Sequence, residues 1–220
     1  MDFALTEKAQ TPETSSAVSA LLELGLVFSL ILSAVWTPVG LANTTASLAA
    51  VACILWFTAR SRFTPRELGL VATSSGAIVT LSLGLLLAVG VFAGGAAIKP
   101  ILGPSHPVPM DRAWQYAIWA LMQEFILQSF FYLRLRSVLG HRRGALLAAS
   151  LFAAVHLPSP ALTLLSFIGG LLFCELFHRY RNLFAIGVAH ALLGLTIASS
   201  LPDSLLHHMR VGIGYLTYHP

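Results

Sequence analysis

Long apolar segments dominate this chain and constrain its fold more than any other feature. A helix needs about 20 apolar residues to cross a bilayer whose hydrocarbon core is about 30 Å thick. The segments that fit or approach this length predict an all-α, polytopic transmembrane helix bundle with about seven to eight spans. The expected spans are Ala17–Trp36, Leu41–Ala59, Val71–Ile98, Ala113–Leu133, Ala145–Leu157, Ala161–Phe177 and Leu183–Ser200.

The composition supports a lipid environment. Of the 220 residues, 56% are hydrophobic and 10% are charged, and the mean hydropathy is +0.79. A soluble domain carries about 25% charged residues, so this chain cannot cover itself with a wettable surface. The net charge of +4 comes from basic residues in separate short loops, which form no patch for nucleic acid. We therefore expect an integral multi-pass membrane protein whose partners include the lipid bilayer and no nucleic acid. The sequence does not indicate an oligomeric state.

The ends of the chain and two prolines complete the expected organisation. Residues 1–16 are mixed polar and predict a short cytoplasmic tail, and residues 17–112 hold the N-terminal transmembrane helices. Pro158 and Pro160 predict a break or tight turn after the fifth span. Residues 201–220 predict a C-terminal tail, an interfacial helix or a partial eighth span.

The distribution of basic residues predicts the orientation. Cytoplasmic loops of membrane proteins carry an excess of Lys and Arg. With the N-terminus in the cytoplasm, ten basic residues lie on the cytoplasmic side and three on the other side, which favours this orientation in what we expect to be a bacterial cytoplasmic membrane. The ten are Lys8, Arg60, Arg62, Arg66, Arg134, Arg136, Arg142, Arg143, Arg179 and Arg181, and the three are Lys99, Arg112 and Arg210.

The third span is rich in glycine. It contains Gly76, Gly84, Gly90, Gly94 and Gly95. Small residues allow membrane helices to approach each other closely, so this pattern predicts a packing face.

Five ionisable residues lie inside the expected spans, where a charge is costly and needs a reason. They are Glu23, Glu124, His156, Glu175 and His190. At about 1.5 Å per residue, Glu124, His156 and His190 lie roughly 15, 18 and 12 Å from the cytoplasmic edge. Three groups on three helices therefore reach a similar depth. Glu175 is close enough to Arg179 to reach the membrane surface, and the position of Glu23 is ambiguous.

These residues offer a coherent chemistry. Glu124 and Gln128 share a helix face at i and i+4, with Gln123 beside them, and Phe152 and His156 have the same spacing. A desolvated carboxylate can act as a general base toward water, and a neutral histidine can orient that water or stabilise an oxyanion. The structural alternative is that each buried group only forms a hydrogen bond with a neighbouring helix and has no catalytic role.

The same residues resemble the motifs of the CAAX protease and bacteriocin-processing (CPBP, or Abi) family of intramembrane proteases. The family motif Glu-Glu-x-x-x-Arg is matched by Gln123–Gln128, Phe-x-x-x-His by Phe152–His156, and His-x-x-x-Asn in part by His190–Gly194. The resemblance covers residues 113–200, which we expect to form a CPBP-like catalytic helix bundle.

The resemblance implies an intramembrane glutamic-type endopeptidase that cleaves a membrane-tethered or lipidated peptide or protein segment. Glu124 would activate water, His156 would position it, and His190 would stabilise the oxyanion. Gln123, Gln128, Phe152 and Gly194 would support them. Three positions depart from the family pattern, because Gln123 replaces a Glu, Gln128 an Arg and Gly194 an Asn. The first two changes together remove an ion pair and keep the net charge of the motif.

Two other functions and a possible metal site remain open. A catalytically impaired relative could use the same pocket as a binding, immunity or maturation partner, since three motif positions have changed. A small transporter would also carry ionisable groups in its spans, although no inverted repeat is present. A metal held by Glu124, His156 and His190 is possible by ligand type. The glutamic mechanism requires no cofactor and no metal, and this is our expectation.

Overall fold

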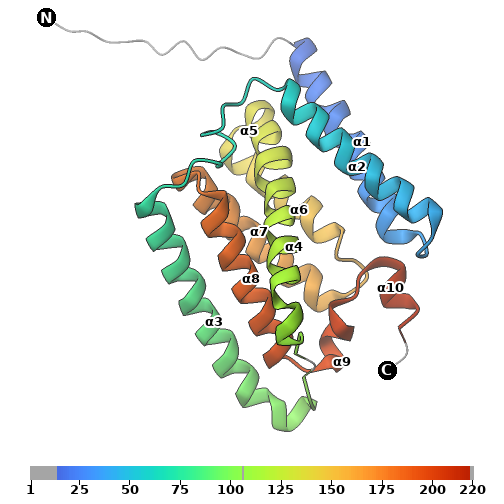
Figure 1. Ribbon diagram of the computed structural model, residues 1–220, viewed down its shortest axis with the longest axis vertical. Coiled ribbons are helices and arrows are strands. Elements are labelled where there is room, and N and C mark those ends of the chain that lie inside the picture. The colour runs from blue at the N-terminus through green and yellow to red at the C-terminus, as the bar shows by residue number, and fades with distance from the viewer. Residues whose placement is uncertain (1–13, 106, 219–220) are drawn as a thin grey trace, which may run out of the picture.

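Every regular element in the described part of the protein is a helix (Figure 1). The computed structural model describes residues 14–105 and 107–218. The helices are α1 (Thr14–Trp36), α2 (Leu41–Arg60), α3 (Ser74–Leu102), η1 (Met110–Arg112), α4 (Ala113–Glu124), η2 (Phe125–Tyr132), α5 (Leu133–Leu139), α6 (His141–Ala154), α7 (Pro160–Tyr180), α8 (Leu183–Ser200), α9 (Asp203–Leu206), η3 (His207–Met209) and α10 (Gly212–Leu216). The prediction of an all-α protein is confirmed. Most of the expected N-terminal tail lies outside the described residues, and α1 begins at Thr14.

The expected count of seven to eight spans is not confirmed. Among the described residues, five helices are long and apolar enough to cross a membrane, namely α1, α2, α3, α7 and α8. The fourth expected span is a continuous helical run in which α4 passes into η2, a π-helix, and then into α5. The fifth expected span, α6, has only 14 residues. The turn predicted by Pro158 and Pro160 separates α6 from α7.

Helix α8 is at the centre of the arrangement. It packs against α3 on one side and α4 on the other, while α6 and α7 pack together as a pair. Helices α1 and α2 form a hairpin beside this group, where α1 contacts α5 and α10 (Figure 1). Local sequence signals mark the N-termini of α7 and α8. Pro160 follows the N-cap Ser159 of α7, and the Asn182 side chain accepts a hydrogen bond from the backbone N–H of Ala185 at 3.1 Å in α8. Both are common ways to satisfy the first turn of a helix.

The glycines of α3 explain how closely it approaches its neighbours. A Cβ atom on Gly84 would lie 2.8 Å from the Cβ of Ala189, and one on Gly95 would lie 2.5 Å from the backbone oxygen of Ser200. Both contacts are with α8, so a side chain at either position would push the two helices apart. Gly90 and Gly94 have nothing within 4 Å of such an atom. The packing face is therefore only part of the glycine-rich stretch.

The loop between α2 and α3 fastens the bundle at the end where α8 begins. The backbone oxygen of Gly69 accepts a hydrogen bond from Leu183 N at 3.0 Å, and the Leu68 oxygen accepts one from Ser129 Oγ at 2.8 Å. Within the loop, the backbone N–H and the hydroxyl of Thr64 both donate to the Glu67 carboxylate. These bonds favour the charged form and lower the pKa of Glu67 below its ordinary value.

The C-terminal segment folds back against the bundle instead of forming another span. Its two α-helices, α9 and α10, have four and five residues. The backbone N–H of Gly212 donates to the Leu157 oxygen at 2.7 Å, which ties this segment to the turn after α6. Gly212 has a φ of +55°, and a Cβ atom there would overlap the backbone oxygen of Val35. The segment thus rests against both α1 and the α6–α7 turn.

Candidate active site

Glu124 is the most enclosed of the predicted site residues. It ends α4 at the junction with the π-helix η2, and its exposed fraction is 0%. Its carboxylate has two partners on opposite oxygens. Gln128 Nε2 donates to Oε2 at 3.0 Å, and His190 Nδ1 lies 2.7 Å from Oε1. The carboxylate is therefore held between an amide of its own helical run and a histidine of α8.

His190 connects this carboxylate to a cavity. With Glu124 ionised, the Nδ1 atom of the imidazole carries the ring proton and donates it to Oε1. The Nε2 atom of a neutral ring then has a free lone pair. The Phe173 ring stacks on the His190 ring, with 5.7 Å between centroids and 20° between planes. These contacts fix the tautomer and the orientation of the ring.

His156 is held in a similar way by the backbone. It lies in the turn that follows α6, and its Nδ1 atom is 2.7 Å from the carbonyl oxygen of Phe152. A carbonyl oxygen can only accept, so Nδ1 carries the proton and Nε2 is the acceptor of the neutral ring. The Phe152 ring lies 4.8 Å from the His156 ring and 6.2 Å from the His190 ring, centroid to centroid. One aromatic side chain therefore packs against both imidazoles.

A cavity of about 230 Å³, here called the central cavity, is lined by five of the predicted site residues, Phe152 among them. Gln123, His156 and His190 line it, whereas Glu124 is buried behind His190. Gly194 also lines this cavity, as do Tyr116 and Ser166, which the sequence motifs did not reveal. Tyr116 lies seven residues before Gln123, two turns along the same helix face. This spacing was the available signal for its place in the cavity.

The Tyr116 side chain lies directly against Gly194. A Cβ atom on Gly194 would overlap the hydroxyl oxygen of Tyr116 and would lie 2.6 Å from its Cζ atom. Helices α4 and α8 are packed neighbours, and this close approach occurs one turn along α8 from His190. The space that a side chain at position 194 would take is therefore filled by a phenol from the facing helix.

A second cavity of about 320 Å³, the apolar cavity, lies between the α1–α2 hairpin and the helices α4, η2 and α6. Its walls include Phe28 and Ile54 from the hairpin, Phe131 from η2 and Leu151 from α6. It shares six lining residues with the central cavity, so the two adjoin. These are Val35, Trp119, Gln123, Phe152, Val155 and His156.

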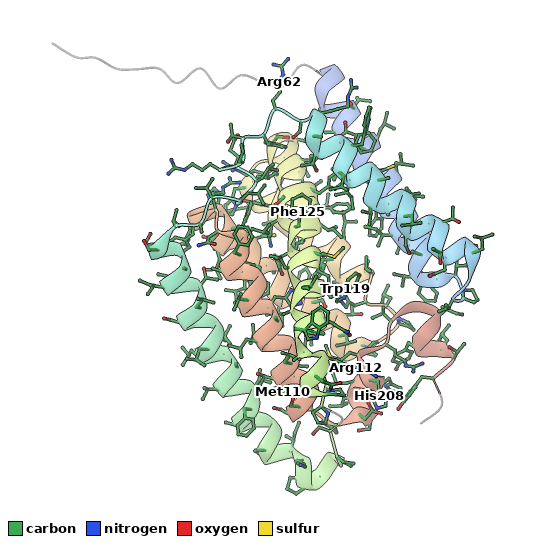
Figure 2. The ribbon with its side chains drawn as sticks, in the orientation of Figure 1. Arg62, Met110, Arg112, Trp119, Phe125 and His208 are labelled. Atoms are coloured by element: carbon green, nitrogen blue, oxygen red, sulfur yellow. The ribbon has the colours of Figure 1, made fainter. Side chains whose placement is uncertain are left out.

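A third cavity of about 610 Å³, the polar cavity, is at the end of the bundle where α4 begins. Arg112, Asp203 and His208 contribute to its walls. It adjoins the central cavity through Tyr116, Trp119 and Met209, which line both. Figure 2 shows Trp119 on α4, with Arg112 and His208 nearer to this end. The central cavity thus adjoins an apolar space and a more polar one.

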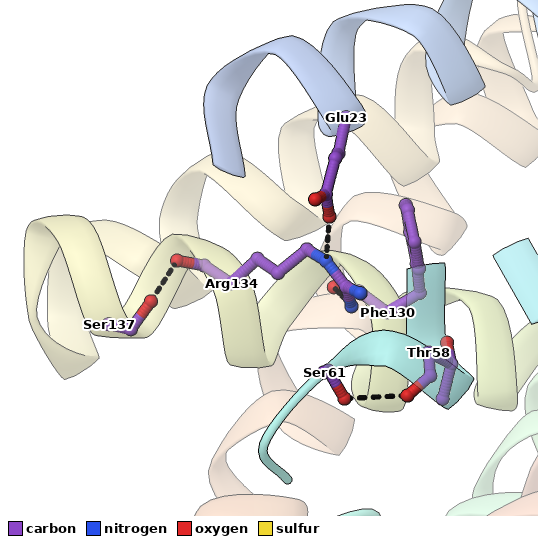
Figure 3. A network of polar contacts seen from close by, with 6 residues as sticks. All are labelled: Glu23, Thr58, Ser61, Phe130, Arg134 and Ser137. Carbon is purple, nitrogen blue, oxygen red and sulfur yellow. Dashed lines mark hydrogen bonds and ion pairs between the residues drawn. The ribbon is translucent and has the colours of Figure 1, made fainter. Parts of the chain in front are cut away.

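The other ionisable residues predicted inside spans lie away from these cavities. Glu23 pairs with Arg134, with 3.0 Å between Oε2 and Nε (Figure 3). Glu175 pairs with Arg179 at 2.6 Å and with His141 at 2.8 Å, and its side chain is 41% exposed. The reach of Glu175 toward the surface agrees with the sequence prediction. Glu23, which was ambiguous from sequence, is the partner of a buried cation.

A metal site receives no geometric support from the described residues. In that part of the chain, no group of three or more His, Cys, Asp or Glu residues is arranged to hold an ion. Glu124 and His190 contact each other directly. The expectation of a metal-free mechanism remains a prediction.

The fold and the site define a class of protein: a helical membrane protein with a buried glutamate–histidine pair beside a central cavity. Residues 110–196 match the family model described as type II CAAX prenyl endopeptidase Rce1-like. The match covers η1 through most of α8 and includes all the motif residues, and it confirms the resemblance to the CAAX protease family. The family is one of membrane proteases. No curated protein and no solved structure matches the chain.

Proposed function

We propose that this protein is an intramembrane endopeptidase that hydrolyses a peptide bond of a membrane-tethered, lipidated segment in the central cavity. The observation that carries the proposal is the Glu124–His190 pair, at 2.7 Å, beside a cavity that His156 also lines. The family match over residues 110–196 supports the reaction class.

The geometry favours a proton route through His190. Glu124 is fully buried, and both of its oxygens already have partners. We therefore assign the proton transfer to His190 Nε2 and give Glu124 the role of holding the ring and stabilising the imidazolium that forms. This arrangement follows the logic of a carboxylate–histidine pair in hydrolases. It modifies the sequence-based hypothesis, in which Glu124 itself takes the proton from water.

His156 supplies a second acceptor for the same water. Its Nε2 lone pair is free because Nδ1 donates to Phe152 O. In the proposed step, the water oxygen bonds to the substrate carbonyl carbon, and one water proton moves to His190 Nε2. The tetrahedral intermediate then collapses, the C–N bond breaks, and His190 returns the proton to the departing amine. Gln123 cannot accept a proton at neutral pH, so we assign it a donor role toward the substrate.

The apolar cavity indicates how the substrate is held. Its walls are almost entirely hydrocarbon, and it adjoins the central cavity beside His156. A prenyl or acyl chain seated there would stay in apolar surroundings and avoid the cost of about 0.8 kcal/mol per CH₂ group that exposure to water carries. A lipidated cysteine seated in this space would bring its neighbouring peptide bond into the central cavity. We therefore propose a lipidated C-terminal segment as the substrate class.

The test is cleavage in proteoliposomes. Purified wild-type protein would be incubated with a dansylated peptide ending in S-farnesyl-Cys-Val-Leu-Ser, with an unlipidated transmembrane peptide carrying a leader-like segment as a second probe, and products would be read by mass spectrometry. We expect cleavage of the farnesylated peptide, and Glu124→Gln should lower kcat by about 10⁴-fold because the ring of His190 loses its anionic partner.

A matched control is available within the chain. Glu175 also pairs with a histidine, His141, at 2.8 Å, but neither residue lines the central cavity. Glu175→Gln should leave kcat within threefold of wild type. Cleavage that stops on adding a chelator would contradict the metal-free route. If wild-type protein with a cooperative thermal transition cleaves no probe, the protease proposal is wrong and a non-catalytic binding role is favoured.

A further inference from the structure

The two histidines of the central cavity do not supply a hydrogen-bond donor for the oxyanion of the proposed reaction. A tetrahedral intermediate places negative charge on the former carbonyl oxygen and needs donors aimed at it. A neutral imidazole has one N–H. His156 directs its N–H to Phe152 O, and beside an ionised Glu124 the His190 ring directs its N–H to that carboxylate. Neither ring therefore has a free N–H for the oxyanion at the moment of attack.

The Tyr116 hydroxyl is a donor in the right part of this cavity. Tyr116 is one of the residues that line the central cavity, and within the described residues no other group forms a hydrogen bond with its hydroxyl. A phenol has an ordinary pKa near 10, so it carries its proton at neutral pH. The hydroxyl oxygen lies against Gly194, and residues four apart on a helix are neighbours at about 5–6 Å. The hydroxyl thus lies one helical turn from His190.

Gly194 is what allows the phenol to reach this place. Any side chain at position 194 would begin with a Cβ atom that overlaps the Tyr116 oxygen. A side chain at position 194 and the Tyr116 phenol cannot both occupy this space. The family motif has an asparagine side chain at this position, and here a hydroxyl group from α4 fills the same space.

We infer that Tyr116 is a catalytic residue that donates a hydrogen bond to the oxyanion, and that Gly194 is the residue that makes room for it. This inference rests on the proposed protease function and adds a residue outside the three motifs. The hydroxyl group is supplied by the facing helix, and Gln123 of the same helix lines the same cavity. The donors for the developing charge therefore come from α4, and the acceptors for the water come from α8 and the turn after α6.

The first experiment removes the hydroxyl alone. Tyr116→Phe keeps the ring and its packing against Gly194, so the fold should be retained, which a thermal unfolding curve in detergent checks. With the farnesylated peptide, we expect kcat to fall by about 10²-fold, the size reported for one lost oxyanion donor, and KM to change less than threefold. A phosphinic analogue of the peptide, whose anionic tetrahedral group mimics the intermediate, should lose affinity by a similar factor. A purely structural role for Tyr116 would not separate this analogue from the substrate peptide.

The second experiment moves the donor to the other helix. In Tyr116→Ala/Gly194→Asn, the phenol is gone and an amide can occupy its space, whereas Tyr116→Ala/Gly194→Leu places a side chain of similar shape without a donor. We expect the Asn variant to be at least tenfold more active than the Leu variant. The Ala single variant should match the Leu variant, since both lack a donor.

The outcomes separate this inference from the protease proposal. If Tyr116→Phe retains wild-type kcat and analogue affinity while Glu124→Gln is inactive, the protein is a protease but the role of Tyr116 is refuted. Equal activity of the Asn and Leu double variants would also refute it. If the folded wild-type protein cleaves no probe and does not bind the analogue, both proposals fail together.

Discussion

Arg134 is a buried cation whose charge is compensated by contacts with Phe130 and Glu23. It is 4% exposed, its guanidinium lies 4.1 Å from the centroid of the Phe130 ring, and Nη1 donates to the Phe130 oxygen at 3.3 Å. Glu23 of α1 supplies the only acidic partner within salt-bridge distance among the described residues. The pair joins the N-terminal hairpin to α5, as Figure 3 shows.

We predict that Glu23→Ala lowers the free energy of unfolding by about 2 kcal/mol. Removing one partner of a buried ion pair costs about 3–5 kcal/mol, and we reduce this figure because the Glu23 side chain is 27% exposed. The double variant Glu23→Leu/Arg134→Met should be closer to wild type, since it leaves no unpaired charge. Denaturant titration in mixed micelles measures both. Equal losses in the single and double variants would mean that packing, and not charge pairing, sets the cost.

At this scale the sequence predicted the positions of the site residues better than their contacts. Glu124, His156 and His190 were expected at a similar depth, and in the structure Glu124 contacts His190 while Phe152 lies beside both imidazoles. The partner of Glu23 is 111 residues away, a distance over which no local pattern carries information. Tyr116 was missed because the family motif has an asparagine at position 194, where this chain has glycine. Sequence spacing alone does not reveal which residue fills the space of the missing side chain.

Among the elements, α3 offers a comparison of glycines within one helix. Gly84 lies against Ala189, whereas nothing lies within 4 Å of a Cβ atom on Gly90. We predict that Gly84→Leu lowers the free energy of unfolding by about 1–3 kcal/mol through overpacking against α8. Gly90→Leu is the matched control, because both changes replace glycine by the same good helix former. It should be neutral or stabilising, as measured by unfolding in mixed micelles. A similar loss for both variants would rule out close packing as the cause.

The sequence predicted the elements that apolar length or a proline determines, and it did not predict the features that arise from packing between helices. Five long apolar runs became helices of spanning length. The prolines marked the end of α6 and the start of α7, as the fixed backbone angle of proline predicts. The length of α6 and the π-helical winding of η2 were not predicted. In the structure α6, α7 and η2 pack against one another, and apolarity alone does not specify such packing. The C-terminal segment has mixed polarity, so its three predicted forms were equally compatible with the sequence.

At the scale of the whole molecule, the apolar cavity depends on two parts of the chain that are far apart in sequence. Ala50 of α2 is 5% exposed and lines this cavity opposite residues of α4 and α6. We predict that Ala50→Phe shortens the space and lowers kcat/KM for a geranylgeranylated peptide at least tenfold relative to the farnesylated one, a loss typical of a pocket deprived of room for extra carbons. Competition between the two peptides in one proteoliposome sample measures the ratio directly.

The control for this prediction is Ala42→Phe, which changes an exposed position on the same helix. It should leave the ratio unchanged. If Ala50→Phe lowers cleavage of both peptides equally, the lipid chain does not extend past Ala50 and the apolar cavity has another role in the substrate complex.

The π-helical winding of η2 has a consequence for comparing this chain with its relatives. A π-helical turn holds one residue more than an α-helical turn between its hydrogen-bonded groups, so the run from Glu124 to Leu133 can lose a residue by rewinding while both ends stay near their places. Length differences among homologues usually collect in loops, yet here a membrane helix can absorb one. An alignment of this lineage should accordingly place a one-residue gap between Gln128 and Tyr132, after the motif that ends at Gln128.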